Sequence, residues 1–181
     1  MSLRNPPKLA RSELKTYALK LLGGKALSVA QLKERLRRRA AHVADVETVA
    51  ADLREYGFLN DRRFAEGFAA SRRDTRGFGR QRVLSDLVKN KVASGVARKA
   101  VDEAFAGVDE PAMIADFLAR KFRGQDLPAL LKNPNKLASV YRRLRGAGFS
   151  TGNSIRALKK YSSEADQLES MEDPDSGAEP A

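Results

Sequence analysis

The chain of 181 residues contains no cysteine and a single histidine, His42. Without cysteine it can form no disulfide, no thiolate nucleophile and no thiolate metal site, which fits a reducing cytoplasm. A lone histidine is a poor candidate for metal binding or general-base catalysis. No pair of carboxylates stands out for acid–base chemistry. We therefore expect a cytoplasmic protein that is not an enzyme and that uses no cofactor and no metal ion.

Long apolar runs are also missing. No segment approaches the roughly 18 consecutive apolar residues that a membrane span requires. The first eleven residues include Pro6 and Pro7 and lack the apolar stretch of a signal peptide. These features predict no membrane association.

Positive charge is the main feature that is present. The chain has 34 Lys and Arg against 23 Asp and Glu, and the last twenty residues, 162–181, hold seven of the acidic residues and no basic one. A body so basic favours a polyanionic partner, either nucleic acid or an acidic protein surface. The acidic segment is predicted to be disordered, and one hypothesis is that it competes with DNA for the basic body.

An amphipathic helical pattern recurs three times along the chain. In each copy a leucine on a basic helix is followed five residues later by a small or apolar residue, at Leu36 and Ala41, Leu87 and Val92, and Leu144 and Phe149. The leucines are spaced by 51 and then 57 residues. Repetition at this period indicates copies of one supersecondary unit packed in series. No segment alternates as a strand does, so we predict an all-α fold of three tandem three-helix modules in an elongated, curved arrangement.

The pattern divides the chain into five parts. We predict a flexible N-terminal extension, three modules and the disordered acidic tail, at residues 1–11, 12–59, 60–107, 108–161 and 162–181. Each module alone would have a marginal core, so packing between neighbouring modules should supply part of the stability.

Several helix ends have recognisable signals. Ser28 and Gln31 have the spacing of a capping box, and Asp45 is predicted to cap the next helix. Gly57 is placed to end that helix in a left-handed conformation, with Phe58 folding back on Leu53. Asn60 is then expected to cap the following helix.

Two groups of arginines are candidates for partner contact. The first surrounds one helix and comprises Arg35, Arg37, Arg38 and Arg39. It would pair with phosphates or carboxylates, or else form a solvated helix back. The second crosses a helix end, a glycine turn and the next helix start, and comprises Arg62, Arg63, Arg72, Arg73, Arg76, Arg80 and Arg82. Positive charge is disfavoured at a helix start, so Arg80 and Arg82 point to a polyanionic or acidic partner.

Three aromatic residues could either pack in the core or contact a partner. Phe78, between two glycines, could stack on a base or pack on Val83 as a hydrophobic staple, and we favour the staple. Tyr56 and Tyr141 fit the spacing of a helical core, so we expect them to pack inside.

The segment from Tyr56 to Asp61, which reads Tyr-Gly-Phe-Leu-Asn-Asp, resembles the signature of the RecX family of recombinase regulators. Gly77-Phe78-Gly79-Arg80 and the run from Leu144 to Phe149 resemble further motifs of that family. One departure is the turn Asn90-Lys91-Val92-Ala93, where the family usually has lysine, glycine and an apolar residue.

The resemblance implies a regulator made of three-helix modules that lies along the groove of a RecA filament on single-stranded DNA. Such a protein would mainly inhibit the recombinase, ATPase and co-protease activities of RecA, and so act in DNA repair, recombination and the SOS response. We expect it to be monomeric. Two alternatives remain open: a free-standing DNA-binding protein that competes for single-stranded DNA, and a purely structural adaptor.

Overall fold

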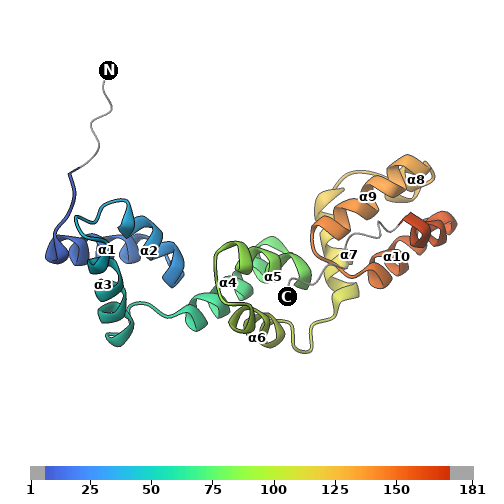
Figure 1. The fold of residues 1–181 in the computed structure, drawn as a ribbon. Helices are drawn as coiled ribbons and strands as arrows, with labels where there is room; N and C mark the ends of the chain where they lie inside the picture. The colour runs from blue at the N-terminus through green and yellow to red at the C-terminus, as the bar shows by residue number, and fades with distance from the viewer. Residues whose placement is uncertain (1–6, 172–181) are drawn as a thin grey trace, which may run out of the picture. The chain divides into compact units, whose positions relative to one another are not determined.

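The computed structural model describes residues 7–171, which are mainly helices joined by short loops (Figure 1). The elements follow in the order α1 (Arg11–Gly24), α2 (Val29–Arg37), α3 (Val43–Glu55), α4 (Asp61–Arg76), α5 (Arg80–Lys89), α6 (Ser94–Ala104), α7 (Glu110–Lys121), α8 (Leu127–Leu131), α9 (Pro134–Gly146), α10 (Thr151–Lys159) and the 3-10 helix η1 (Ser163–Met171). Between residues 7 and 171 there is no strand, only an isolated bridge between Leu9 and Ala40. The all-α prediction is confirmed.

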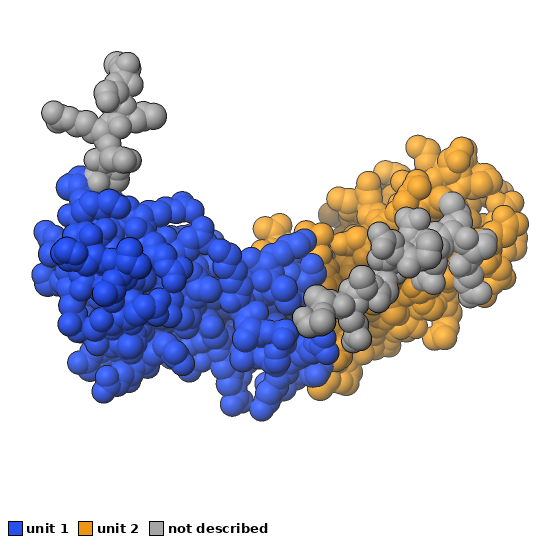
Figure 2. Space-filling model, viewed as in Figure 1, with its two compact units in different colours: residues 1–71, 84–104 blue, residues 72–83, 105–181 orange. Residues whose placement is uncertain are grey.

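The chain forms two compact units (Figure 2). Unit 1 comprises residues 1–71 and 84–104, and unit 2 comprises residues 72–83 and 105–181. The unit boundaries fall inside α4 and α5. The division into modules at 12–59, 60–107 and 108–161 therefore stays a prediction, and each unit is described by itself below.

The first core of unit 1 is built by α1, α2 and α3. Its fully buried side chains repeat at helical spacing and include Leu14, Leu32, Leu36, Val49 and Leu53. Burying each such side chain contributes about 1.5–3 kcal/mol. The capping box at the start of α2 is confirmed, because Ser28 Oγ accepts from the Gln31 amide and Gln31 Oε1 accepts from the Ser28 amide, both at 3.2 Å.

The segment before α1 is tied to the turn after α2. The Leu9 amide donates to the Arg39 carbonyl at 2.7 Å, and the Ala41 amide donates to the Leu9 carbonyl at 2.9 Å. The flexible extension predicted for residues 1–11 is therefore wrong from Leu9 onward, and residues 1–6 lie outside the described part. This pairing also places Ala40 rather than Ala41 in the core.

At each end of α3, the predicted role belongs to a different residue. The helix begins at Val43 with His42 as its N-cap, so Asp45 lies inside the first turn. Gly57 does adopt a left-handed conformation, with φ of 73°. The residue that then folds back is Leu59, whose amide donates to the Leu53 carbonyl at 3.0 Å and which is buried, whereas Phe58 is exposed.

Unit 2 holds a second core between α7, α8, α9 and α10. Phe149 is fully buried there and meets the Phe117 ring edge-on, with centroids 5.5 Å apart. Ala165 and Leu168 of η1 are buried in the same core. The disorder predicted for 162–181 is therefore wrong for the segment that carries these two residues, because they supply apolar surface that the core covers. Residues 172–181 lie outside the described part.

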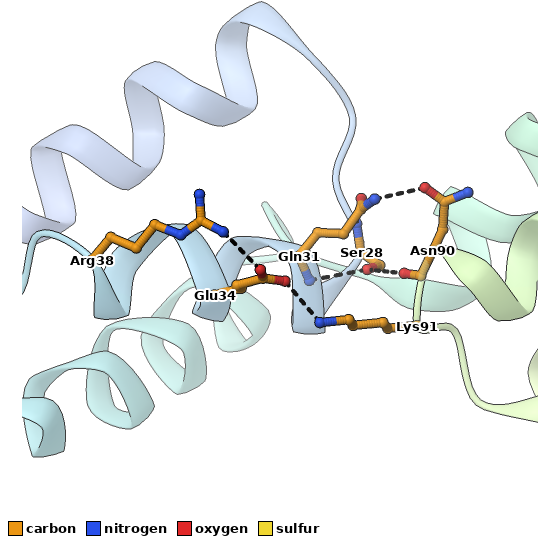
Figure 3. Close-up of polar contacts among 6 residues, drawn as sticks. All are labelled: Ser28, Gln31, Glu34, Arg38, Asn90 and Lys91. Carbon is orange, nitrogen blue, oxygen red and sulfur yellow. Dashed lines mark hydrogen bonds and ion pairs between the residues drawn. The ribbon is translucent and has the colours of Figure 1, made fainter.

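In unit 1 the start of α2 contacts the turn between α5 and α6 (Figure 3). Ser28 Oγ donates to the Asn90 carbonyl at 2.7 Å, and Gln31 Nε2 donates to Asn90 Oδ1 at 2.6 Å. Lys91 Nζ donates to Glu34 at 2.8 Å. The fully buried Ser28 hydroxyl is thus satisfied from both sides. We call this contact the unit 1 joint.

The turn of this joint has an unusual backbone. Lys91 has φ of 60° and is the only residue other than glycine with positive φ in the described part. A side chain in this conformation costs roughly 1–2 kcal/mol. This is the position at which the RecX-like pattern would have glycine.

Replacing Lys91 separates the backbone cost from the ion pair with Glu34. Both Lys91→Ala and Lys91→Gly remove the ammonium group, but only the glycine variant relieves the left-handed backbone. We expect Lys91→Gly to be more stable than Lys91→Ala by about 0.5–1 kcal/mol, after the larger chain entropy of unfolded glycine is counted. Thermal and urea unfolding of both variants measures this difference. A more stable alanine variant would contradict the assignment.

In unit 2 the Glu110 carboxylate holds the start of α10. It accepts from the Ser150 amide at 2.9 Å, from the Ser150 hydroxyl, and from Asn153 Nδ2 at 2.5 Å. Burial disfavours the charged form, but the hydrogen bonds from Ser150 and Asn153 and the charge of Arg145 outweigh burial. The pKa of Glu110 is therefore lower than usual.

This shift predicts an acid-dependent loss of stability. Because the pKa is lowered on folding, the charged carboxylate stabilises unit 2 fully above about pH 4.3, the value for an unfolded glutamate, and this contribution disappears as the pH falls through the lower folded value. At pH 7 we expect Glu110→Gln to lose about 1 kcal/mol, since the carboxyl is only partly buried. The difference in melting temperature between the unaltered protein and Glu110→Gln should be smaller at pH 3 than at pH 7. An equal difference at both pH values would refute this role of the Glu110 carboxylate.

Candidate interaction surface

The predicted arginines divide between the two units. Arg35 to Arg39 and the pair Arg62 and Arg63 belong to unit 1, whereas Arg72, Arg73, Arg76, Arg80 and Arg82 belong to unit 2. The surface is therefore described as two separate sets.

The arginines of α2 are partly neutralised by carboxylates of unit 1. Arg38 pairs with Glu34 at 2.9 Å, and Arg37 pairs with Glu47 at 3.3 Å. The hydrogen bond and charge of Lys91, with the charge of Arg38, lower the pKa of Glu34, and Lys33 acts in the same way on Glu47. Both carboxylates are therefore ionised at neutral pH, and an incoming anion competes with them.

Three further members of the unit 1 set have partners within the protein. The guanidinium of the half-buried Arg39 lies over the Tyr17 ring, 5.3 Å from its centroid. Arg63 Nη2 donates to the Gly57 carbonyl at 2.7 Å and so satisfies the end of α3. Arg62 pairs with Glu66, one turn further along α4, at 2.7 Å.

The first part of the unit 2 set lies at the end of α4. Arg73 Nε donates to Asp74 at 2.6 Å, and this hydrogen bond lowers the pKa of Asp74. Arg76 is exposed in the last turn. Arg120 of α7 packs against Gly77, where a Cβ would come within 1.9 Å of Arg120 Nη2. A cavity of about 340 Å³ opens beside these groups.

The start of α5 is held by the turn between α9 and α10. The Gly79 amide donates to the Ala147 carbonyl at 2.8 Å, and the Gln81 amide donates to the Gly148 carbonyl at 3.1 Å. Gly79 and Gly148 lie 51 and 57 residues after Ser28 and Lys91, the intervals of the sequence repeat. This unit 2 joint therefore repeats the unit 1 joint with backbone groups in place of side chains.

The unit 2 joint gives Arg82 a local role. Arg82 Nη1 donates to the Gly146 carbonyl at 3.3 Å, and its guanidinium lies 5.4 Å from the Phe78 centroid. Positive charge is favoured at the end of α9, which offsets its unfavourable place at the start of α5. Phe78 is half-buried beside it. Arg80 is exposed at the same helix start.

Sequence reasoning missed cations of unit 2 that lie outside the two predicted groups. Arg145 Nη1 donates to the Phe149 carbonyl at 2.5 Å and to Gln81 Oε1 at 3.4 Å. Arg143 lies 5.8 Å from the Phe122 centroid. The available signal was the composition of residues 108–161, where basic residues far outnumber acidic ones. Arg120, which packs against Gly77, is another basic residue of this segment.

Two other kinds of site are absent from the described part of the chain. No group of three or more His, Asp or Glu side chains there is placed to hold a metal ion. No helix there has the length and apolarity to cross a membrane. The two sets can bind anions through their guanidinium groups.

Comparison with known proteins gives consistent matches. Residues 60–101 match a family described as RecX, second three-helix domain. Regulatory protein RecX of Streptomyces coelicolor is 30% identical over 158 residues, which cover 86% of this chain and 80% of that protein. RecX of Cronobacter sakazakii is 33% identical over 140 residues, 71% of this chain and 81% of that protein. The crystal structure of RecX from Lactobacillus salivarius has a similar fold, with a TM-score of 0.62 and 17% identity over 83% of this chain and 96% of that chain.

The unit 2 joint predicts a strict requirement for glycine at position 79. A Cβ there would lie 2.3 Å from the Gly148 carbonyl oxygen, and a backbone atom cannot move aside cheaply. We expect Gly79→Ala to destabilise the protein by about 2 kcal/mol or more. Gly67→Ala is the matched control, because Gly67 lies inside α4 with nothing within 4 Å of its Cβ position. That variant should gain about 0.5–1 kcal/mol. Thermal unfolding distinguishes the two, and equal effects would contradict the joint.

Proposed function

Because this chain belongs to the RecX family of regulatory proteins, we propose that it binds RecA filaments on single-stranded DNA and mainly inhibits the recombinase, ATPase and co-protease activities of RecA. Family membership is the observation that carries the proposal. The cationic sets of both units support it, since they suit phosphates and carboxylates alike. We place this action in the cytoplasm, with a monomer as the binding form and no membrane partner.

Inhibition would follow from contact with neighbouring RecA subunits. A ligand shifts an equilibrium between two states only through its different affinity for them. A protein that bridges adjacent subunits binds the assembled filament better than separate subunits or rearranged ones. It would therefore block subunit addition or slow the rearrangements that ATP turnover requires.

The structure guides the choice of cations for a test. Arg82, Arg63 and Arg39 have contacts that support the fold, so their replacement would confuse stability with binding. Arg76 and Arg80 are exposed at the end of α4 and the start of α5. Because both side chains are open to solvent, these two are the preferred contact residues for the filament.

The test is the ATPase activity of a bacterial RecA on single-stranded DNA, with this protein at substoichiometric concentration. We expect Arg76→Glu combined with Arg80→Glu to weaken inhibition at least ten-fold, because two lost charge-assisted contacts are worth about 1.5 kcal/mol or more together. Arg123→Glu combined with Lys132→Glu is the matched control, since it reverses two exposed cations of unit 2 outside the predicted set.

Two outcomes would count against the proposal. Normal inhibition by the Arg76 and Arg80 variant would exclude these residues as the contact surface. Inhibition that appears only when the protein coats the DNA, and that excess bare single strand removes, would favour simple competition for DNA. A filament-binding regulator should act below that coating concentration.

A further inference from the structure

Two aromatic side chains lie on the surface of unit 1 at the corner between α3 and α4. Tyr56 is 63% exposed and Phe58 is 56% exposed, and no other aromatic residue of the described part is among its large exposed apolar side chains. The prediction that Tyr56 packs in the core is therefore wrong, whereas Tyr141 is buried as expected. A single exposed ring would be unremarkable, but here two rings separated by one residue are both exposed.

The core of unit 1 does not need these rings. Leu53 and Leu59 are buried on either side of the corner and supply its apolar contacts. Had Phe58 folded back on Leu53, as the sequence suggests, one ring would be hidden. The observed backbone places Leu59 inside instead and leaves both rings in solvent.

The backbone that carries the rings is held in place by several hydrogen bonds. Gly57 has φ of 73°, and the Leu59 amide donates to the Leu53 carbonyl at 3.0 Å. Arg63 Nη2 donates to the Gly57 carbonyl at 2.7 Å, and the Arg63 amide donates to Asn60 Oδ1 at 3.0 Å. The two rings are thus presented by an ordered turn between two helices, so a ligand would pay little entropy to order it.

Cations border the corner. Lys15 Nζ lies 4.8 Å from the centroid of the Tyr56 ring, and Arg63 bonds to the glycine between the two rings. The Asp52 carboxylate forms ion pairs with two cations near this corner, Lys15 at 3.2 Å and Arg11 at 3.8 Å. The three cations Lys15, Arg11 and Arg63 face two acidic residues, Asp52 and the exposed Glu55 that precedes Tyr56, so these five groups together carry one positive charge.

We propose that Tyr56 and Phe58 form a stacking site for bases of single-stranded DNA, with Lys15 and Arg63 placed to neutralise the adjoining phosphates. Exposed rings beside cations are the two elements that single-strand binders combine. An apolar protein partner would remove water from Lys15 and Arg63 without adding an anion beside them, which is costly, so the charges favour DNA. The inference rests on the proposed function, which brings the protein to single-stranded DNA. Of the residues of this site, only Arg63 belongs to the predicted arginine sets.

The test compares two oligonucleotides of equal length and charge, an oligothymidylate and its abasic analogue, by fluorescence anisotropy with the full chain. We expect Tyr56→Ala combined with Phe58→Ala to weaken binding of the oligothymidylate about five-fold or more per ring. Binding of the abasic strand should not change, because it has no base to stack. Val43→Ala is the control, since Val43 is another exposed apolar residue of unit 1.

A second measurement uses the absence of tryptophan from the chain. Tyr56→Trp introduces one indole at the corner and keeps an aromatic ring there. Its emission should be quenched by the oligothymidylate and much less by the abasic strand. Equal quenching by both strands, or no quenching at saturating DNA, would overturn the stacking site.

The outcomes separate this inference from the proposed function. Loss of base-dependent binding by the double alanine variant supports the stacking site, whatever its effect on RecA. Unchanged DNA binding with lost inhibition of RecA ATPase would overturn it and assign the rings to a protein contact. Unchanged DNA binding and unchanged inhibition would overturn it while leaving the regulatory function intact.

Discussion

The starts of α2 and α5 each receive a turn from a later part of the chain, and this contact organises both units. At the unit 1 joint a buried serine hydroxyl bonds to the Asn90 carbonyl, and at the unit 2 joint the Gly79 and Gln81 amides bond to the turn after α9. The first amides of a helix have no partner within the helix itself. In unit 2 the joint satisfies such groups with main-chain carbonyls, so it combines helix capping with long-range packing.

The chemistry of the two joints differs while their place in the repeat is the same. In unit 1 the side chains of Ser28 and Gln31 donate to the main-chain carbonyl and the Oδ1 of Asn90, and Lys91 has a left-handed backbone. Unit 2 uses glycines that let two backbones approach closely.

Contacts within the protein also give several of the basic residues a structural role. Several arginines that the sequence presents as a cationic surface have partners within the protein: Arg38 pairs with Glu34, Arg63 satisfies the end of α3, and Arg82 binds the end of α9. A high net charge is therefore not the same as an equally large contact surface. The proposed contacts are the exposed Arg76 and Arg80 and the aromatic corner of Tyr56 and Phe58, whose exposure no charge count would reveal.

The sequence by itself determined most of the α-helices, the capping box at Ser28, the left-handed Gly57 and the spacing of the repeat, but neither α8 nor η1. These features depend on residues within one or two turns of each other, and local propensities are sufficient to predict them. The tertiary structure alone decided that Leu59 rather than Phe58 enters the core, that Ala165 and Leu168 pack instead of remaining disordered, and that Lys91 reaches Glu34 across 57 residues. The physical reason is that burial and ion pairing are set by neighbours distant in the chain, which no local pattern specifies.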